Sequence, residues 1–189
     1  YEKNLTDGTS PNTAALTQSG TFTVTALDGL QTLTVGGITV VSGGVAVGFP
    51  QSITTPLGST LTITGFNPET GVVSYSYALV DNETHLDADG TNSITENFNV
   101  VATDTDGSTA SGQINVNIVD DLPTAKPDAD SVQEGGTVSG NVLDNDIGGA
   151  DGLGEVIGVR AGGNTSTPAV GGLNTQINGN YGYLTLDAN

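Results

Sequence analysis

The sequence predicts an all-β protein, and three observations support this prediction. Of its 189 residues 28 are Gly, and runs rich in Thr, Val, Ser and Asn lie between them; this composition favours strands and turns over helices. No stretch of ten residues carries a helical period, whereas several stretches alternate polar and apolar residues, as a half-buried strand does. Aromatic residues make up only 5% of the chain, so the cores must be thin and aliphatic.

Residues 1–122 are expected to form one β-sandwich domain. The polar segment 1–20, with turn signals at Asp7-Gly8 and Ser10-Pro11, is expected to be a loosely ordered lead-in. The expected strands that follow are 21–27, 30–35, 38–41, 60–64, 73–79, 94–102 and 114–118. Short strands punctuated by turns at this spacing are typical of an immunoglobulin-like sandwich.

Tyr75 and Tyr77 share the apolar face of the expected strand 73–79. They are candidates for a ligand platform. The favoured interpretation is that both rings pack in the core while their hydroxyl groups reach the edge of the sandwich.

A linker, 123–127, is predicted between this domain and a second one, 128–189. Pro123 and Pro127 fix φ and push the residues before them into extended conformations, so the linker is expected to be stiff. The strand-like runs of the second domain are 131–143 and 155–161, followed by a hairpin of 175–177 and 182–186 around Asn178-Gly179-Asn180. With few large apolar side chains, a sandwich of this size is marginal. We expect it to be truncated or split, with an open strand edge.

The net charge of the chain limits the classes of partner that it can bind. Lys and Arg together number 3, whereas Asp and Glu together number 21, which gives a formal net charge of −18. Nucleic acid is not an expected partner, because phosphate binding depends on basic residues, and anionic membrane surfaces are disfavoured for the same reason. No apolar run of 18 residues is present, so direct membrane insertion is not expected. The acidic residues either serve solubility alone or bind cations that relieve their repulsion.

The acidic residues cluster in turns and around the predicted linker, which favours a metal. The chain has no cysteine, and ions can stabilise a β protein where disulfides are absent. Hard cations such as Ca²⁺ take six to eight oxygen ligands from flexible loops. The candidate ligands are Asp120, Asp121, Asp128 and Asp130 around the linker, and Asp104, Asp106, Asp144 and Asp146 in turns.

Each cluster also has a plainer interpretation. Asp-Gly, as at Asp106-Gly107, is common in ordinary hairpin turns, and the linker can be merely acidic. Asp121 and Asp128 can lie about 23 Å apart if the chain between them is extended, so one ion cannot join both. Oxygen ligands from turns, such as those of Asp104, Asp106 or Glu134, would then have to complete a site at each end.

An enzyme is not expected. His85 is the single histidine and stands in a polar loop of a chain without cysteine, so there is no Cys–His pair and His85 is expected to be an ordinary loop residue. A Ser–His–Asp triad would need a nucleophile, and no nucleophile-elbow motif is present. Glycoside hydrolysis would need an aromatic cleft, yet Trp is absent.

Several motifs resemble a known family. The segments 100–112 and 118–125, with 55–65 and 73–77 upstream, look like repeats of giant type I secreted RTX adhesins of Gram-negative bacteria. The later segments 140–146 and 181–186 are similar to the cadherin-like, VCBS-type repeats of the same proteins. The resemblance implies tandem immunoglobulin-like or cadherin-like sandwiches, an extracellular location at the cell surface, and calcium at the domain junctions. It also implies that the Leu184-Thr185-Leu186 strand continues into a further strand, which the chain ending at Asn189 does not contain.

The function that follows is a structural extender segment of a surface adhesin, stiffened by Ca²⁺, that projects a binding tip for cell adhesion and biofilm formation. Its expected partners are neighbouring repeats of the same chain, while the host or surface ligand is bound elsewhere in the full-length protein. The alternative is a calcium-dependent module that itself binds sugar or peptide, with its pocket in the loop 81–92 and Asp87 as a ligand residue.

Overall fold

The computed structural model describes residues 1–86 and 90–188, and it confirms the all-β prediction. The chain forms two compact units, Tyr1–Gly152 and Leu153–Asn189. This division differs from the predicted boundaries at 122 and 128, because the residues after the sandwich fold back on it: Ala150 is buried among the core residues, and its N–H donates to Asp121.

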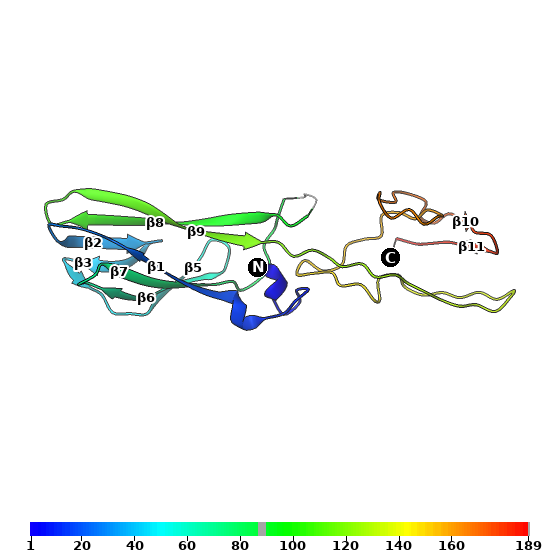
Figure 1. Ribbon diagram of the computed structural model, residues 1–189, viewed down its shortest axis with the longest axis horizontal. Helices are drawn as coiled ribbons and strands as arrows, with labels where there is room; N and C mark the ends of the chain where they lie inside the picture. Colours follow the sequence, from blue (N-terminus) through cyan, green and yellow to red (C-terminus); the bar gives the residue numbers. More distant parts are fainter. Residues whose placement is uncertain (87–89, 189) are drawn as a thin grey trace. The chain divides into compact units, whose positions relative to one another are not determined.

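The first unit contains two antiparallel sheets that face each other (Figure 1). One sheet has the order β1-β7-β6-β5, with strands β1 (Thr17–Thr23), β7 (Val72–Ala78), β6 (Thr60–Asn67) and β5 (Gln51–Thr54). The other has the order β4-β3-β2-β8-β9, with strands β4 (Val45–Ala46), β3 (Ile38–Ser42), β2 (Leu30–Val35), β8 (Ser93–Asp104) and β9 (Thr109–Val119). With β1 taken as strand B, the orders β1-β7-β6 and β4-β3-β2-β8-β9 correspond to B-E-D and C″-C′-C-F-G of a variable-type immunoglobulin sandwich. Among the described residues no strand A pairs with β1 and no second sandwich follows, so the predicted tandem arrangement is not confirmed.

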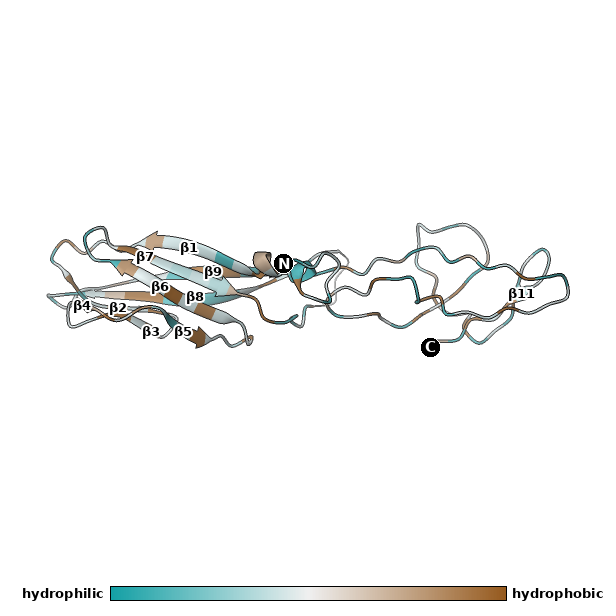
Figure 2. Cartoon of the chain, turned by 90° about the horizontal axis from the view of Figure 1, so that it is seen from below, coloured by the Kyte–Doolittle hydropathy of each residue, from teal (hydrophilic) through white to brown (hydrophobic). Residues whose placement is uncertain are grey.

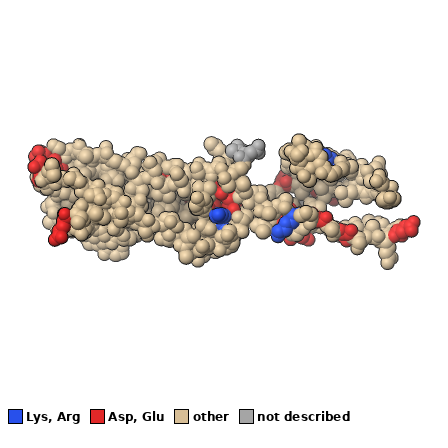
Figure 3. Space-filling model, in the orientation of Figure 1, with Lys and Arg blue, Asp and Glu red and all other residues tan. Residues whose placement is uncertain are grey.

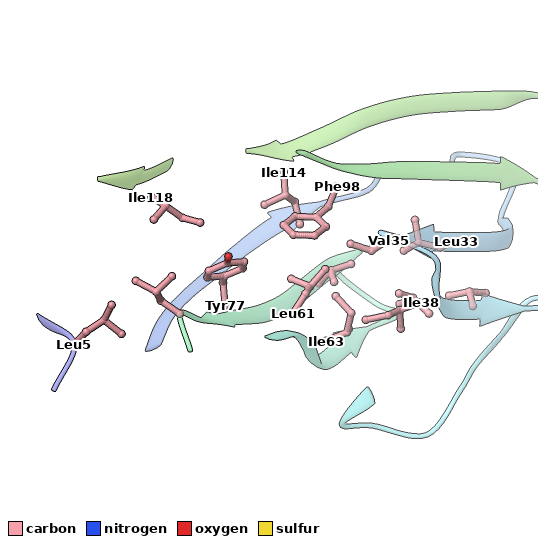
Figure 4. Close-up of a cluster of buried hydrophobic side chains, with 14 of the residues drawn as sticks. Leu5, Leu33, Val35, Ile38, Leu61, Ile63, Tyr77, Phe98, Ile114 and Ile118 are labelled. Atoms are coloured by element: carbon pink, nitrogen blue, oxygen red, sulfur yellow. The ribbon is translucent and has the colours of Figure 1, made fainter. Parts of the chain in front are cut away.

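The core lies between these sheets and is aliphatic, as expected from the composition. Leu33 and Val35 of β2 face Leu61 and Ile63 of β6, and all four side chains are fully buried. Figure 4 shows them near the rings of Tyr77 from β7 and Phe98 from β8, and Figure 2 shows the apolar segments of these strands in brown. Removal of such side chains from water at roughly 25 cal/mol per Å² is the main force that joins the two sheets.

Tyr77 is buried in this core, as predicted, whereas Tyr75 is only half-buried. The ring of Tyr77 lies 6.1 Å from the ring of Phe98, centre to centre. Its hydroxyl donates a 2.7 Å hydrogen bond to Oε2 of Glu96. The backbone N–H of Leu57 donates to Oε1 of the same carboxylate at 3.1 Å, so both oxygens of this buried acid are satisfied.

The N-terminal segment is ordered, and the prediction of a loose lead-in is wrong. Two 3-10 helices, η1 (Glu2–Asn4) and η2 (Thr13–Leu16), precede β1. Glu2 is fully buried and Leu5 is a core residue at 4% exposure. The polar composition of the segment concealed this burial, because its contacts are with residues far along the chain.

The strands predicted for residues 131–143 and 155–161 are absent. In the structure these stretches are turns and irregular chain. The regular pairing in or near them is limited to two isolated bridges, Gly158 with Gly171 inside the second stretch and Thr124 with Ile147 next to the first. The predicted C-terminal hairpin is confirmed in shorter form, as β10 (Ile177–Asn178) antiparallel to β11 (Tyr183–Leu184). No helix in the described part of the chain has the length and apolar character that crossing a membrane requires.

Candidate metal centre

Glu2, His85 and Asp120 form a compact group in the first unit. The potential ligand atoms of the three side chains lie within 4.8 Å of one another. Nε2 of His85 is 3.1 Å from Oε2 of Glu2, and the two side chains are 5% and 0% exposed. Three segments distant in sequence therefore meet here: η1, the loop after β7, and the end of β9.

Local structure explains how each residue reaches this place. Asp120 is the first residue after β9, and its N–H donates to the carbonyl of Asn92 at 3.0 Å, which extends the β8–β9 ladder. His85 is oriented by Nδ1, which lies 2.6 Å from Oδ1 of Asn92. Glu2 accepts the backbone N–H of Glu83 at Oε1 over 2.7 Å, and this bond ties η1 to the loop after β7.

The group contains buried polar atoms without a hydrogen-bond partner. They are Oε1 of Glu83 and Oδ1 of Asp120. Oε2 of Glu2 and Nε2 of His85 have no other partner and face each other at 3.1 Å, as an ion pair when the imidazole is protonated. Native proteins satisfy nearly all such atoms, because an unpaired buried polar group costs about 1–3 kcal/mol, and more when it is charged. A bound cation would satisfy the carboxylate oxygens and neutralise their charge. These residues therefore fit a metal ion.

The pKa values reflect the same burial. Removal from water raises the pKa of Glu2 above its ordinary value, although the N–H of Glu83 and the neighbouring His85 act in the opposite direction. Burial also raises the pKa of Glu83, with further increases from the charges of Glu96 and Glu2. For His85, burial alone lowers the pKa, but its hydrogen bonds to Glu2 and Asn92 and the charge of Glu2 outweigh it, so the net pKa is raised.

In the absence of metal, the chain is expected to be more stable at about pH 5 than at about pH 8. Above the ordinary carboxyl pKa of 4.5, folded Glu2 and Glu83 hold protons that the unfolded chain has released, so stability falls as pH rises through their raised values. The contribution of His85 is complete below 6.5 and is also lost as pH rises through its raised pKa. Urea unfolding in EDTA at stepped pH measures this slope. Glu2→Gln should flatten it, and a stability that rises with pH would contradict the assignment.

Asp121 has a different role from its neighbour. Its side chain is 6% exposed; Oδ2 accepts the N–H of Thr9 at 2.7 Å and that of Ala150 at 3.2 Å, while Oδ1 accepts the hydroxyl of Thr9. A carboxylate that accepts hydrogen bonds from two backbone N–H groups and one hydroxyl is well stabilised without an ion. Asp121 therefore fastens the N-terminal segment and the turn at residues 149–150 to the end of β9.

A second acidic group lies at the opposite end of the β8–β9 hairpin. The ligand atoms of Asp28, Asp104 and Asp106 are within 4.8 Å of one another, and the first and last of these residues are exposed. Hydrogen bonds lower the pKa of Asp106, with contributions from Asp104 and from the hydroxyl and N–H of Ser108. Because β9 (Thr109–Val119) spans about 33 Å at 3.3 Å per residue, Asp104 and Asp106 cannot complete a site at Asp120. Figure 3 shows acidic side chains at this far end, separated from those near the N-terminus by a largely uncharged surface.

The other predicted ligands accept hydrogen bonds from the protein. Oδ1 of Asp146 accepts the N–H of Lys126 at 2.7 Å, and Oδ1 of Asp128 accepts the amide of Asn145 at 3.1 Å. Asp130 and Asp144 each accept a hydrogen bond from a residue close in sequence, the N–H of Ser131 and the side-chain amide of Asn141 respectively. Among the described residues, none of these four belongs to a group of three potential ligands.

Sequence reasoning missed Glu2, Glu83 and Asp28, and it treated His85 as an ordinary loop residue. A signal for Glu83 was available, because it lies close to Asp81 just before the acidic loop. Nothing local marks Glu2, which becomes a candidate only through its contact with a residue 81 positions away. Asp87, the ligand residue proposed in the loop 81–92, lies outside the described residues.

No family model, curated protein or solved structure matches the chain.

Proposed function

We propose that the chain is a structural segment of a bacterial cell-surface adhesin, and that bound calcium stiffens it. The observation that carries the proposal is the group of Glu2, His85 and Asp120, whose potential ligand atoms lie within 4.8 Å of one another and include the unpartnered Oδ1 of Asp120, where the chain leaves the sandwich. The resemblance to RTX adhesin repeats supports an extracellular location and a role in adhesion and biofilm formation. In this role the segment carries load between neighbouring repeats and does not itself catalyse a reaction.

The proposed mechanism is electrostatic cross-linking. Without a cation, the carboxylates of Glu2, Glu83 and Asp120 repel one another in a site of low polarity, where charges interact more strongly than in water. Proton uptake by His85 relieves only part of this repulsion. A divalent cation bound by Glu2, His85 and Asp120 would hold the N-terminal segment, the loop after β7 and the end of β9 together.

Calcium is the proposed ion because the group is dominated by carboxylate oxygens, which are the preferred ligands of hard cations. His85 favours a second candidate, since imidazole nitrogen is a common ligand of Zn²⁺ and other transition metals. The two candidates differ in their dependence on the imidazole. Calcium binding should survive His85→Gln, whereas zinc binding should be lost with it.

The test is a calorimetric titration and a thermal melt of the full chain, in EDTA and in excess Ca²⁺, Mg²⁺ or Zn²⁺. At a free Ca²⁺ concentration one hundred times Kd, binding to the folded state adds about 2.7 kcal/mol, which corresponds to roughly 5–10 °C in Tm for a chain of this size. Glu2→Gln should remove most of this increase. Asp128→Asn, a change at an exposed predicted ligand, is the matched control and should retain it.

Mechanical measurement separates the structural role from simple ion binding. Forced unfolding is governed by the unfolding barrier, so the force that unfolds the sandwich should be higher in Ca²⁺ than in EDTA, and Glu2→Gln should remove the difference. If Ca²⁺ changes neither Tm nor the unfolding force, the acidic groups serve solubility and the proposal is wrong.

A further inference from the structure

Asn92, the residue before β8, contacts two members of the candidate metal group. Oδ1 of its side chain lies 2.6 Å from Nδ1 of His85, and its backbone carbonyl accepts the N–H of Asp120 at 3.0 Å. Glu2 meets the same imidazole at the other ring nitrogen, Nε2, over 3.1 Å. The ring of His85 is therefore held between an amide at one nitrogen and a carboxylate at the other.

The hydrogen bonds of Asn92 decide which end of its amide faces the imidazole. Nδ2 donates to the backbone carbonyl of Leu86 at 2.9 Å. A carbonyl oxygen only accepts hydrogen bonds, so the NH₂ group must be the end that faces Leu86. Oδ1 then faces Nδ1 of His85, and because an amide oxygen also only accepts, Nδ1 must carry a proton.

This proton leaves Nε2 of His85 free to bind a metal. A neutral imidazole has a single N–H, so when Nδ1 holds it, Nε2 keeps a lone pair. The side chain of His85 is 5% exposed, and Nε2 faces Oε2 of the fully buried Glu2. Two acceptor atoms in this position repel each other unless a proton or a cation lies between them. A cation bound by both atoms would satisfy both.

Proteins use the same arrangement to present histidine to transition metals. A ligating imidazole commonly donates its other N–H to a carbonyl or carboxylate oxygen, which fixes the tautomer and the orientation of the ring. In a tetrahedral Zn²⁺ site, with nitrogen and oxygen ligands about 2.0–2.2 Å from the metal, neighbouring ligand atoms lie roughly 3.3 Å apart. The 3.1 Å between Nε2 of His85 and Oε2 of Glu2 is close to this spacing, and Asp120 offers a further oxygen within 4.8 Å.

We propose that Asn92 is a positioning residue of this metal site. It keeps the proton of His85 on Nδ1, presents Nε2 beside the two carboxylates, and so lets the site bind Zn²⁺ as well as Ca²⁺. This inference rests on the metal group of the proposed function but not on which ion stiffens the segment. The two ions compete for the same carboxylates, and only Zn²⁺ depends on the imidazole, because Ca²⁺ takes oxygen ligands.

The first test is ¹⁵N NMR of the full chain in EDTA, at a pH high enough to leave the imidazole neutral. His85 is the single histidine of the sequence, so the signals of its two ring nitrogens are assigned directly. We expect the Nδ1–H tautomer in the native chain. In Asn92→Leu the acceptor is missing, and the proton should move to Nε2, where it can donate to Glu2. A native chain with the proton on Nε2 would overturn the proposal.

The second test is a calorimetric titration of the same proteins with Zn²⁺ alone and with Ca²⁺ alone. Loss of the outer hydrogen bond of a ligating histidine weakens metal binding by about 10–100-fold, so Asn92→Leu should weaken Zn²⁺ binding by that factor and leave Ca²⁺ binding unchanged. Asn92→Asp keeps an acceptor for Nδ1–H and should retain both the tautomer and the Zn²⁺ affinity. Asn97→Leu, at an exposed position of β8 outside the group, is the matched control and should alter neither.

The ratio between the two ions separates positioning from a merely structural role. Equal weakening of Zn²⁺ and Ca²⁺ binding in Asn92→Leu would mean that the substitution distorts the whole group, and it would reject the proposal. A native chain that binds Ca²⁺ but not Zn²⁺ would reject it as well, while leaving the proposed function intact. Zn²⁺ binding without Ca²⁺ binding would have the opposite meaning: it would contradict calcium as the stiffening ion and support the role of Asn92.

Discussion

Asp121→Ala is expected to lower the free energy of unfolding by about 3–4 kcal/mol and to release the N-terminal segment. The substitution leaves two backbone N–H groups, those of Thr9 and Ala150, without their acceptor. Hydrogen bonds to a charged group contribute about 1.5–3 kcal/mol each and are not additive. Denaturant unfolding in EDTA measures the loss, and hydrogen exchange of residues 1–16 should increase with it.

Substitution of Asp120, the neighbour of Asp121, is expected to have a different effect. Oδ1 of Asp120 has no partner and lies beside Glu2, so Asp120→Asn should leave the metal-free chain unchanged or slightly stabilised while weakening its metal binding. Asp128→Ala, at an exposed site, should change stability by less than about 0.5 kcal/mol. If Asp121→Ala and Asp128→Ala have similar effects, the hydrogen bonds of Asp121 do not hold the segment.

Local sequence pattern was sufficient to predict most strands of the sandwich. The predicted strand 30–35 matches β2, and the predicted 60–64 and 73–79 fall on β6 and β7. In these segments one face is buried and the other is exposed, so the alternation of side chains records the fold directly. β1 was predicted four residues too late, since its burial pattern is weak along Thr17–Ser19.

The same pattern failed where a strand has no partner. Residues 131–143 alternate in the manner of a strand, yet Val132 and Val138 are exposed at 54% and 44%. A strand depends on a neighbouring strand for its backbone hydrogen bonds and on a second layer to cover its apolar face. Within the described residues neither a neighbouring strand nor a second layer is present around this stretch, so its apolar side chains have nothing to pack against.

The candidate site was predicted only in part, for a similar reason. Asp120 was identified because two acids precede Pro123, a feature visible in the sequence. Its companions Glu2 and His85 come from segments with no metal-binding pattern of their own, and the packing of the sandwich brings them together. Long-range contact also distinguishes Asp120 from Asp121, since only the second meets the donors of Thr9 and Ala150.

Gly71→Ala is expected to destabilise the sandwich by about 3 kcal/mol, for two separate reasons. Gly71 ends the loop between β6 and β7 with φ of +69°, and a Cβ atom there would lie 2.0 Å from the carbonyl oxygen of Val24. The left-handed conformation costs an alanine roughly 1–2 kcal/mol. The collision must also displace Val24, whose N–H donates to the carbonyl of Gly71 at 2.9 Å, and loss of such a bond costs about 1–3 kcal/mol.

Gly58→Ala separates these two causes. Gly58 has a similar φ of +83°, but no atom lies within 4 Å of the position that its Cβ would take. This control should therefore show the conformational cost alone, about 1–2 kcal/mol. The difference between the two variants in urea unfolding then measures the contact of the loop with Val24, which fixes the chain as it leaves β1. Equal losses in both variants would mean that the loop can move away from Val24 at no cost, and that this contact does not hold the end of β1 in place.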